Sequence, residues 1–141
     1  MEYKELKLDN QICFPLYVVS KEVIRRYKPF LDGLGVTYTQ YITLMVLWER
    51  KKMNVKQLGE LLFLDSGTLT PLLKKLEKNG YVSRERDKID ERNVIVCITK
   101  KGLTLRKNAK EVPNNVAECM EITSEDASDL FRILRKVMKD L

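Results

Sequence analysis

The sequence predicts a mainly α-helical fold with one small β-hairpin, and three observations support this. Apolar residues recur at three- and four-residue intervals in several segments, which is the period of an amphipathic helix. Two runs rich in Val, Ile and Tyr, residues 81–86 and 93–99, flank the charged link DKIDER and predict the hairpin. The chain has 141 residues, 44% hydrophobic and 33% charged, which is typical of one soluble domain with a single core.

A first helix is expected within residues 10–27, where the apolar residues follow the helical period. It should end near Lys28, because Pro29 disfavours the helical conformation of the residue before it. Pro15 has no backbone N–H, so the regular helix should start near Phe14 or begin with a distorted turn.

A central domain is predicted over residues 37–99. Thr37 opens a Thr-x-x-Gln capping box before a very apolar helix, which should form the core. Asn54 caps a short helix, and a further helix spans about 66–79. Two short helices joined by a tight link predict a helix-turn-helix, and the hairpin at 81–99 would complete a winged helix-turn-helix.

The flanking segments, residues 1–36 and 100–141, are expected to form dimerisation helices. Thr99 should cap a helix that runs to about Glu121 and is interrupted by Pro113, and a Thr-x-x-Asp capping box precedes the last helix. The first and last helices carry longer apolar stripes than the central domain needs for its own core. An obligate homodimer through these helices is therefore expected, and the alternative is a monomer in which they fold back.

The composition excludes several kinds of active site. The chain has no His, which removes Ser/His and Cys/His catalysis and zinc sites of the HExxH kind. Its 3 Cys include no CxxC motif, which argues against a zinc ribbon and a disulfide scaffold. We therefore expect no enzyme, no metal and no other cofactor. A charged N-terminus and the lack of a long apolar run predict a cytoplasmic protein with no membrane partner.

Charge is concentrated in the middle of the chain. The formal net charge is +6, and residues 50–110 alone hold 16 Lys/Arg against 7 Asp/Glu. A basic centre between near-neutral ends favours an anionic polymer as partner, and double-stranded DNA suits a winged helix-turn-helix. The alternative is a basic surface that is merely solvated.

Candidate DNA contacts lie on the recognition helix, about 66–79, and on the wing. Hydroxyl groups near the start of this helix can reach base edges, and the lysines that follow can reach phosphates: Ser66, Thr68, Thr70, Lys74 and Lys75. The wing adds Arg84, Arg86 and Arg92, and an arginine near its tip can enter a narrow minor groove. The alternatives are helix capping for the hydroxyls and a solvated hairpin for the arginines.

Several separated motifs carry a resemblance to a known family. The recognition helix and wing of the multiple-antibiotic-resistance regulator (MarR) family resemble the span DSGTLTPLLKKLEKNGYVSRERDKIDERNVIVCIT, with Asp90-Glu91-Arg92 at the wing motif. The organic-hydroperoxide repressors and related staphylococcal thiol regulators of this family are similar at LDNQICFPLY and LDSGTLTPLLKK. The resemblance implies a repressor that binds an inverted-repeat operator, with Asp90 bracing Arg92.

Cys13 is the candidate redox sensor. It stands at the start of the first predicted helix, where the positive end of the helix dipole stabilises the thiolate that attacks peroxides. Taken alone, a cysteine on an apolar helix is more often structural. The resemblance implies instead that Cys13 is reactive, that Tyr27 and Tyr38 donate hydrogen bonds to it, and that its oxidation releases DNA.

The other two cysteines are less informative. Cys97 lies among Val and Ile in the second wing strand, and we expect it to be a small buried side chain. Cys119 is expected near the end of the long fifth helix, where the resemblance implies either a resolving cysteine that forms a disulfide with Cys13 of a partner chain or a structural residue in a one-cysteine regulator. Two further readings of the whole chain are a regulator released by a small aromatic ligand and a thiol peroxidase.

Overall fold

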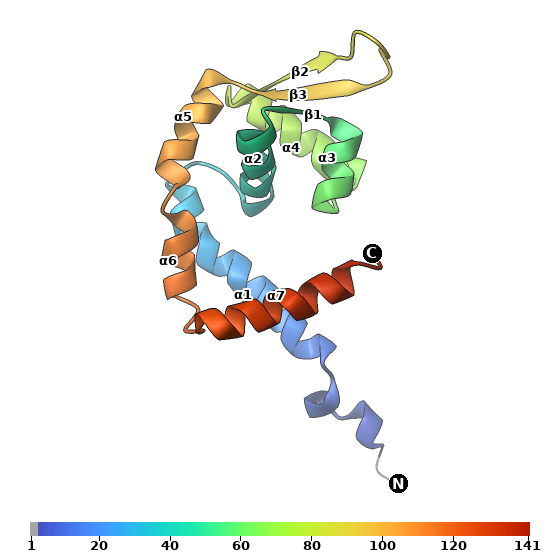
Figure 1. Ribbon diagram of the computed structural model, residues 1–141, viewed down its shortest axis with the longest axis vertical. Coiled ribbons are helices and arrows are strands. Elements are labelled where there is room, and N and C mark those ends of the chain that lie inside the picture. Colours follow the sequence, from blue (N-terminus) through green and yellow to red (C-terminus); the bar gives the residue numbers. More distant parts are fainter. Residues whose placement is uncertain (1–2) are drawn as a thin grey trace. The chain divides into compact units, whose positions relative to one another are not determined.

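The computed structural model describes residues 3–141. The chain forms two compact units, and the boundary between them falls between Lys110 and Glu111. The first unit contains two short 3-10 turns, five α-helices and three strands, and the second contains two helices (Figure 1). The prediction of a mainly helical chain with a small amount of antiparallel sheet is confirmed.

Helix α1 spans Cys13–Asp32 and is longer than expected. It starts next to Phe14, as the position of Pro15 predicted, but it does not end at Lys28. Pro29 lies inside the helix, so the prediction of the C-terminal end was wrong. A proline so close to the end removes one helical hydrogen bond, and burial of Leu31, which is only 2% exposed, in the following turn offsets that loss. The 3-10 turns η1, Lys4–Leu6, and η2, Leu8–Asn10, precede α1.

Helix α2, Tyr38–Arg50, is the centre of the first unit. Its predicted capping box is present: the Thr37 side chain accepts from the Gln40 N–H, and the Gln40 side chain accepts from the Thr37 N–H. Leu44 and Leu47 are fully buried, and the indole N–H of Trp48 donates to the Gly102 carbonyl at 2.8 Å. The expectation that this helix forms the core is confirmed.

Helices α3, Val55–Leu62, and α4, Ser66–Lys78, form the predicted helix-turn-helix. Asn54 caps α3 by accepting from two backbone N–H groups. The turn requires Gly59, since a Cβ there would lie 2.9 Å from the carbonyl oxygen of Leu64, and it places Phe63 at φ 54°. The two helices are therefore held in a fixed tight corner.

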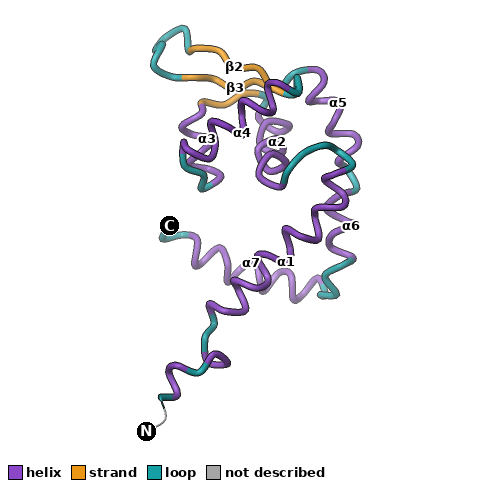
Figure 2. The backbone as a smooth tube through the Cα atoms, turned by 180° about the vertical axis from the view of Figure 1, so that it is seen from behind, coloured by secondary structure: helices purple, strands orange, loops and turns teal. Residues whose placement is uncertain are grey.

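The wing is part of a three-stranded antiparallel sheet in the order β1-β3-β2, which Figure 2 shows in orange. Strands β2, Val82–Arg86, and β3, Val94–Ile98, form the predicted hairpin. Strand β1, Lys52–Asn54, pairs with the other edge of β3 and was not predicted. A strand of 3 residues is too short to show alternation, so the sequence carries no local signal for it.

The expected long fifth helix is two helices, which is a second correction. Helix α5 spans Lys100–Ala109 and α6 spans Val112–Glu118, so no helix continues to Glu121. Pro113 explains the break, because it has no N–H to donate to the Ala109 carbonyl and instead occupies the first turn of α6. The boundary between the two compact units falls at this break.

Helix α7, Ser124–Met138, follows α6 in the second unit. The predicted capping box is present, with Thr123 and Asp126 exchanging hydrogen bonds. Most of its large apolar side chains are exposed in the single chain, Leu134 is partly exposed, and none of its residues is buried. The exposed set is Leu130, Phe131, Ile133, Val137 and Met138.

Candidate nucleic-acid interface and reactive cysteine

Helix α4 has one buried and one exposed face, and the predicted contact residues all lie on the exposed face. The buried stripe is Leu69, Leu72, Leu73 and Leu76. The exposed set is Ser66, Thr68, Thr70, Lys74 and Lys75. The cap of this helix is Asp65, whose Oδ1 accepts from the Thr68 N–H at 2.8 Å. Since Asp65 is the cap, the hydroxyl of Ser66 is not needed for capping.

Arg84 is engaged in an ion pair that joins two elements of the chain. Its guanidinium makes two hydrogen bonds to Glu77 of α4, at 3.0 and 2.8 Å, and its side chain is only 27% exposed. The Arg84 N–H also donates to Glu77, and this guanidinium holds the pKa of the Glu77 carboxyl below its ordinary value. Arg84 therefore ties strand β2 to helix α4, a role that sequence reasoning missed because it depends on how β2 packs onto α4.

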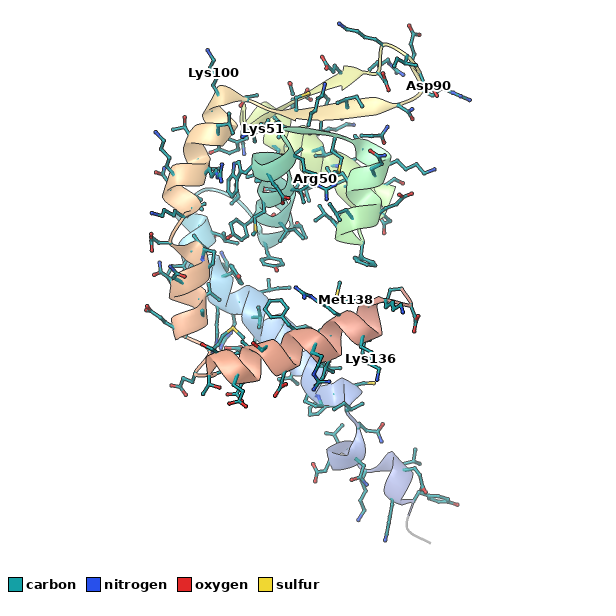
Figure 3. All side chains as sticks on the ribbon, viewed as in Figure 1. Arg50, Lys51, Asp90, Lys100, Lys136 and Met138 are labelled. Atoms are coloured by element: carbon teal, nitrogen blue, oxygen red, sulfur yellow. The ribbon has the colours of Figure 1, made fainter. Side chains whose placement is uncertain are left out.

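The loop of the wing is braced by its own charged side chains. Arg92 binds Asp90 through Nε at 3.0 Å and Nη2 at 3.1 Å, as the family resemblance implied. This ion pair lowers the pKa of the Asp90 carboxyl, although Arg92 is 90% exposed. Arg86 donates to the Glu91 carbonyl at 2.8 Å and closes the loop from its other side. Figure 3 labels Asp90 in the loop between β2 and β3.

Cys13 is the first residue of α1 and is exposed. The turns before it are fixed by two amide side chains: Asn10 donates to the Lys4 carbonyl at 2.7 Å, and Gln11 donates to the Lys7 carbonyl at 3.3 Å. The residue before Cys13, Ile12, is 76% exposed, and no side chain caps the helix. The first backbone N–H groups of α1 thus lie beside the thiol, which is the arrangement expected from the sequence.

Tyr27 and Tyr38 lie together, with ring centroids 5.0 Å apart. A third ring, Tyr41, joins them at 5.8 Å from Tyr27, which sequence reasoning missed although Tyr38 and Tyr41 are one helical turn apart. Burial raises the pKa of all three phenols, and the pKa of Tyr27 and Tyr41 rises further beside neighbouring phenolate charge. At neutral pH these hydroxyls remain protonated and can donate hydrogen bonds.

Cys13 and Tyr27 do not meet within one chain. They are separated by 14 residues of the continuous helix α1, and at a rise of about 1.5 Å per residue this places them about 21 Å apart. The structure therefore brings the two tyrosines together and leaves the cysteine at the far end of the same helix.

Cys97 and Cys119 also lie at positions that differ from those expected. Cys97 is partly exposed, because it points to the face of β3 opposite that of fully buried Val96, and its Sγ lies 3.9 Å from a carboxylate oxygen of Glu85. Burial and the nearby Glu85 charge raise the pKa of this thiol. Cys119 is exposed and ends the short helix α6 rather than a long fifth helix.

Within residues 3–141, no group of three or more His, Cys, Asp or Glu side chains could hold a metal ion. No helix there combines the length and apolar character that crossing a bilayer requires.

Comparison with known proteins decides the family. The sequence family described as "Transcriptional regulator SarA/Rot" matches residues 25–109, which is more than half of the chain. The chain belongs to this family. The match runs from within α1 to the end of α5 and so includes the whole winged helix-turn-helix.

Similar proteins extend the likeness to nearly the whole chain. The organic hydroperoxide resistance transcriptional regulator of Bacillus subtilis is 41% identical over 140 residues, covering 99% of this chain and 95% of that protein. The HTH-type transcriptional regulator SarZ of Staphylococcus haemolyticus is 44% identical over 140 residues, with the same coverage of 99% and 95%. The predicted resemblance to organic-hydroperoxide and staphylococcal regulators is confirmed, and these relatives are named as regulators.

A solved relative, AbfR of Staphylococcus epidermidis, supports the fold. Reduced AbfR bound to DNA superimposes with a TM-score of 0.81 at 34% identity, covering 99% of this chain and 98% of that one. A disulfide form of AbfR matches with a TM-score of 0.67 at 33% identity, covering 96% and 95%. The winged-helix prediction is confirmed by these matches.

Proposed function

We propose that this chain is a homodimeric repressor that binds double-stranded DNA in the cytoplasm and is released when Cys13 is oxidised. The observation that carries the proposal is an exposed thiol at the start of α1 in a chain whose winged helix-turn-helix offers an exposed polar helix face. The relatives named above, an organic hydroperoxide resistance regulator and a reduced DNA-bound AbfR, support the same combination.

DNA binding is assigned to α4 and the wing. The exposed hydroxyls at the start of α4 suit base edges in the major groove, and Lys74 and Lys75 suit phosphates. In the wing, Arg92 is the groove-entering arginine and Asp90 holds it in place. Arg86 stands beside them, whereas Arg84 contributes by holding the wing on α4 through Glu77.

The dimer is supported by apolar surface that a single chain leaves exposed. Ile12 and Phe131, at 76% and 61% exposure, belong to two separate helical segments with many exposed apolar side chains. Helix faces with many exposed apolar side chains are uncommon on monomers and mark an interface. A second copy of the same chain is the economical partner, and its two α4 helices would then read an inverted repeat.

A dimer also provides the partners that Cys13 lacks in its own chain. Since Cys13 and Tyr27 are about 21 Å apart along α1, we assign the tyrosines that donate to the thiolate to the second copy. Tyr27 and Tyr38 form a half-buried pair whose hydroxyls stay protonated at neutral pH, so they can stabilise a thiolate without neutralising it.

Oxidation would change this site chemically. The Cys13 thiolate attacks the peroxide O–O bond, takes one oxygen as sulfenic acid and expels an alkoxide. The negative charge that the tyrosines had stabilised is lost, and their hydrogen bonds must rearrange. Each chain reacts once, so the proposal predicts consumption of one peroxide per chain rather than the continuing turnover of a thiol peroxidase.

Cys119 is proposed as the residue that resolves the sulfenic acid. Its thiol would attack the sulfenic sulfur of the partner's Cys13, forming an intersubunit disulfide and releasing water. The disulfide form of AbfR supports such a step in a relative. Non-reducing gels should show a covalent dimer after peroxide, which is lost in Cys13→Ser and Cys119→Ser and kept in Cys97→Ser. A monomer whose Cys13 carries a small-thiol adduct would instead make Cys119 structural.

The test of the proposed function compares wild type and Cys13→Ser on DNA. Reduced wild type should bind an inverted-repeat duplex and lose it after organic hydroperoxide, whereas Cys13→Ser should bind equally and remain bound. Release of Cys13→Ser by the same peroxide would refute Cys13 as the sensor. Affinity should fall steeply with salt, because lysine and arginine contacts displace counterions from phosphates.

A second candidate is release by a small aromatic ligand. It is favoured by a cavity of about 230 Å³ in the first unit, lined by apolar Ile24 and Leu31, the Tyr38 ring and the cations Arg25 and Lys28. An aromatic ring would fit the apolar wall, whereas Arg25 and Lys28 are already paired with Glu22 and Asp32. Titration of reduced Cys13→Ser on DNA with salicylate separates the two functions, since only a ligand-released regulator would dissociate.

A further inference from the structure

The tip of the wing presents an isoleucine to solvent. Ile89 is 97% exposed, which is the largest value among the exposed large hydrophobic residues of the described chain. It stands between Lys88 and Asp90 in the loop that joins β2 to β3. At this exposure its side chain has no part in the core of the first unit.

Its exposure is fixed by the loop. The Ile89 N–H donates to Asp87 Oδ1 at 3.0 Å, and the Asp87 N–H donates to the Asn93 carbonyl at 2.9 Å. Arg86 closes the loop onto the Glu91 carbonyl. Because the backbone on both sides is held, Ile89 cannot turn inward without breaking these bonds.

The charged side chains around Ile89 indicate what kind of partner the wing tip binds. Asp87 and Asp90 are turned to the loop's own N–H groups and to Arg92, whereas Lys88 is exposed and Arg92 keeps 90% of its side chain accessible. The loop therefore offers outward cations on both sides of an aliphatic group. This combination suits a DNA minor groove, whose walls are deoxyribose and whose edges are phosphate.

We propose that Ile89 lies in the minor groove beside each half-site and makes the wing select A·T over G·C pairs, an inference that rests on the proposed DNA-binding function. The floor of the groove at A·T pairs carries only acceptors, whereas G·C adds the projecting N2 amino donor. An aliphatic side chain cannot accept a hydrogen bond, so at G·C it both meets that amino group and leaves it unsatisfied.

The test uses duplexes selected from a random pool by the reduced wild-type protein. The flanks that the wings reach are then set to A·T, G·C or inosine·C pairs, the last of which lacks the N2 amino group but keeps the major-groove pattern of G·C. Wild type should bind the A·T and inosine·C duplexes about tenfold more tightly than the G·C duplex. Ile89→Ser should bind all three within about twofold, whereas the matched control Ile89→Val should keep the preference.

Lys88→Ala distinguishes a contact to phosphate from discrimination between base pairs. It should weaken binding to all three duplexes by the same factor, because a phosphate contact carries no base information. A tenfold preference that survives in Ile89→Ser, or a wild type without any preference, would overturn the inference while leaving DNA binding intact. Failure of the wild type to enrich any duplex would refute the proposed function and the inference together.

Discussion

The winged helix-turn-helix and the apolar helices α1 and α7 differ in how far their apolar side chains are buried within one chain. In the first, the core leucines are buried, the helices are capped and Arg84 is paired with Glu77. In the second, α7 has no buried residue, and α1 buries only Leu31. The winged helix-turn-helix is thus complete within one chain, whereas the proposed function assigns the exposed apolar faces of α1 and α7 to contact with a second copy.

The largest effect should come from placing a charge on the exposed apolar surface of α7. Phe131→Asp loses about 1.5–3 kcal/mol of burial per copy, and a symmetric dimer carries the change twice, so its dissociation constant should rise by about 100-fold or more. Sedimentation equilibrium measures this. Lys136→Asp introduces the same side chain elsewhere on α7 and serves as the control. A Phe131→Asp protein that remains dimeric at wild-type affinity would show that α7 is outside the interface.

Truncation of a buried core side chain should lower stability by nearly as much, but through contacts within one chain. Leu76 is 0% exposed, and Leu76→Ala should lower the free energy of unfolding by about 2–5 kcal/mol. Because Leu76 packs inside the winged domain, the difference from wild type should be the same at every protein concentration in urea titrations. A difference that grows on dilution would contradict the view that this domain is complete in one chain.

Loss of a single helix cap should have a smaller effect. Thr37→Ala removes the acceptor for the Gln40 N–H at the start of α2 and should cost about 1 kcal/mol. Thr104, within α5, donates its hydroxyl to the Lys100 carbonyl, and Thr104→Ala should change stability much less. Thermal unfolding of the two variants checks the order, and equal losses would mean that the capping box adds nothing.

The smallest effect should be the pH dependence of the bond between α4 and the wing. The folded pKa of Glu77 lies below its unfolded value of about 4.3, so its stabilising contribution is present above that pH and is lost as pH falls through the lowered pKa. Glu77→Gln should therefore be less stable than wild type at pH 7, and the difference should vanish in acid. Glu60→Gln on α3 is the control. A difference that is unchanged in acid would mean that the pair with Arg84 contributes nothing through charge.

Much of the fold could be predicted from local signals. Capping boxes at Thr37 and Thr123 fixed two helix starts, and the leucine stripe of α4 marked its buried face. The end of α1 could not be predicted, because burial of Leu31 after Pro29 is a tertiary effect. Strand β1 was missed for the same reason, since it exists only by pairing with β3.

The candidate site was predicted in part. Residue types and spacing identified the exposed face of α4, and the family resemblance implied the Asp90–Arg92 pair. They could not show that Arg84 is held by Glu77, which needs the fold of β2 onto α4, or that the Tyr41 ring joins those of Tyr27 and Tyr38. The predicted helix already separated Cys13 from Tyr27, and the longer observed helix α1 keeps them about 21 Å apart.

A mixed dimer tests most directly that the sensor is completed by the second copy. One chain carries Cys13→Ser with both tyrosines intact, and the other keeps Cys13 but carries Tyr27→Phe and Tyr38→Phe. The rate of Cys13 oxidation is measured by mass spectrometry after addition of organic hydroperoxide. If tyrosines act across the dimer, the remaining cysteine faces an intact pair and should react at the wild-type rate. A rate equal to that of the double-tyrosine homodimer would place the tyrosines' action within one chain and contradict the composite site.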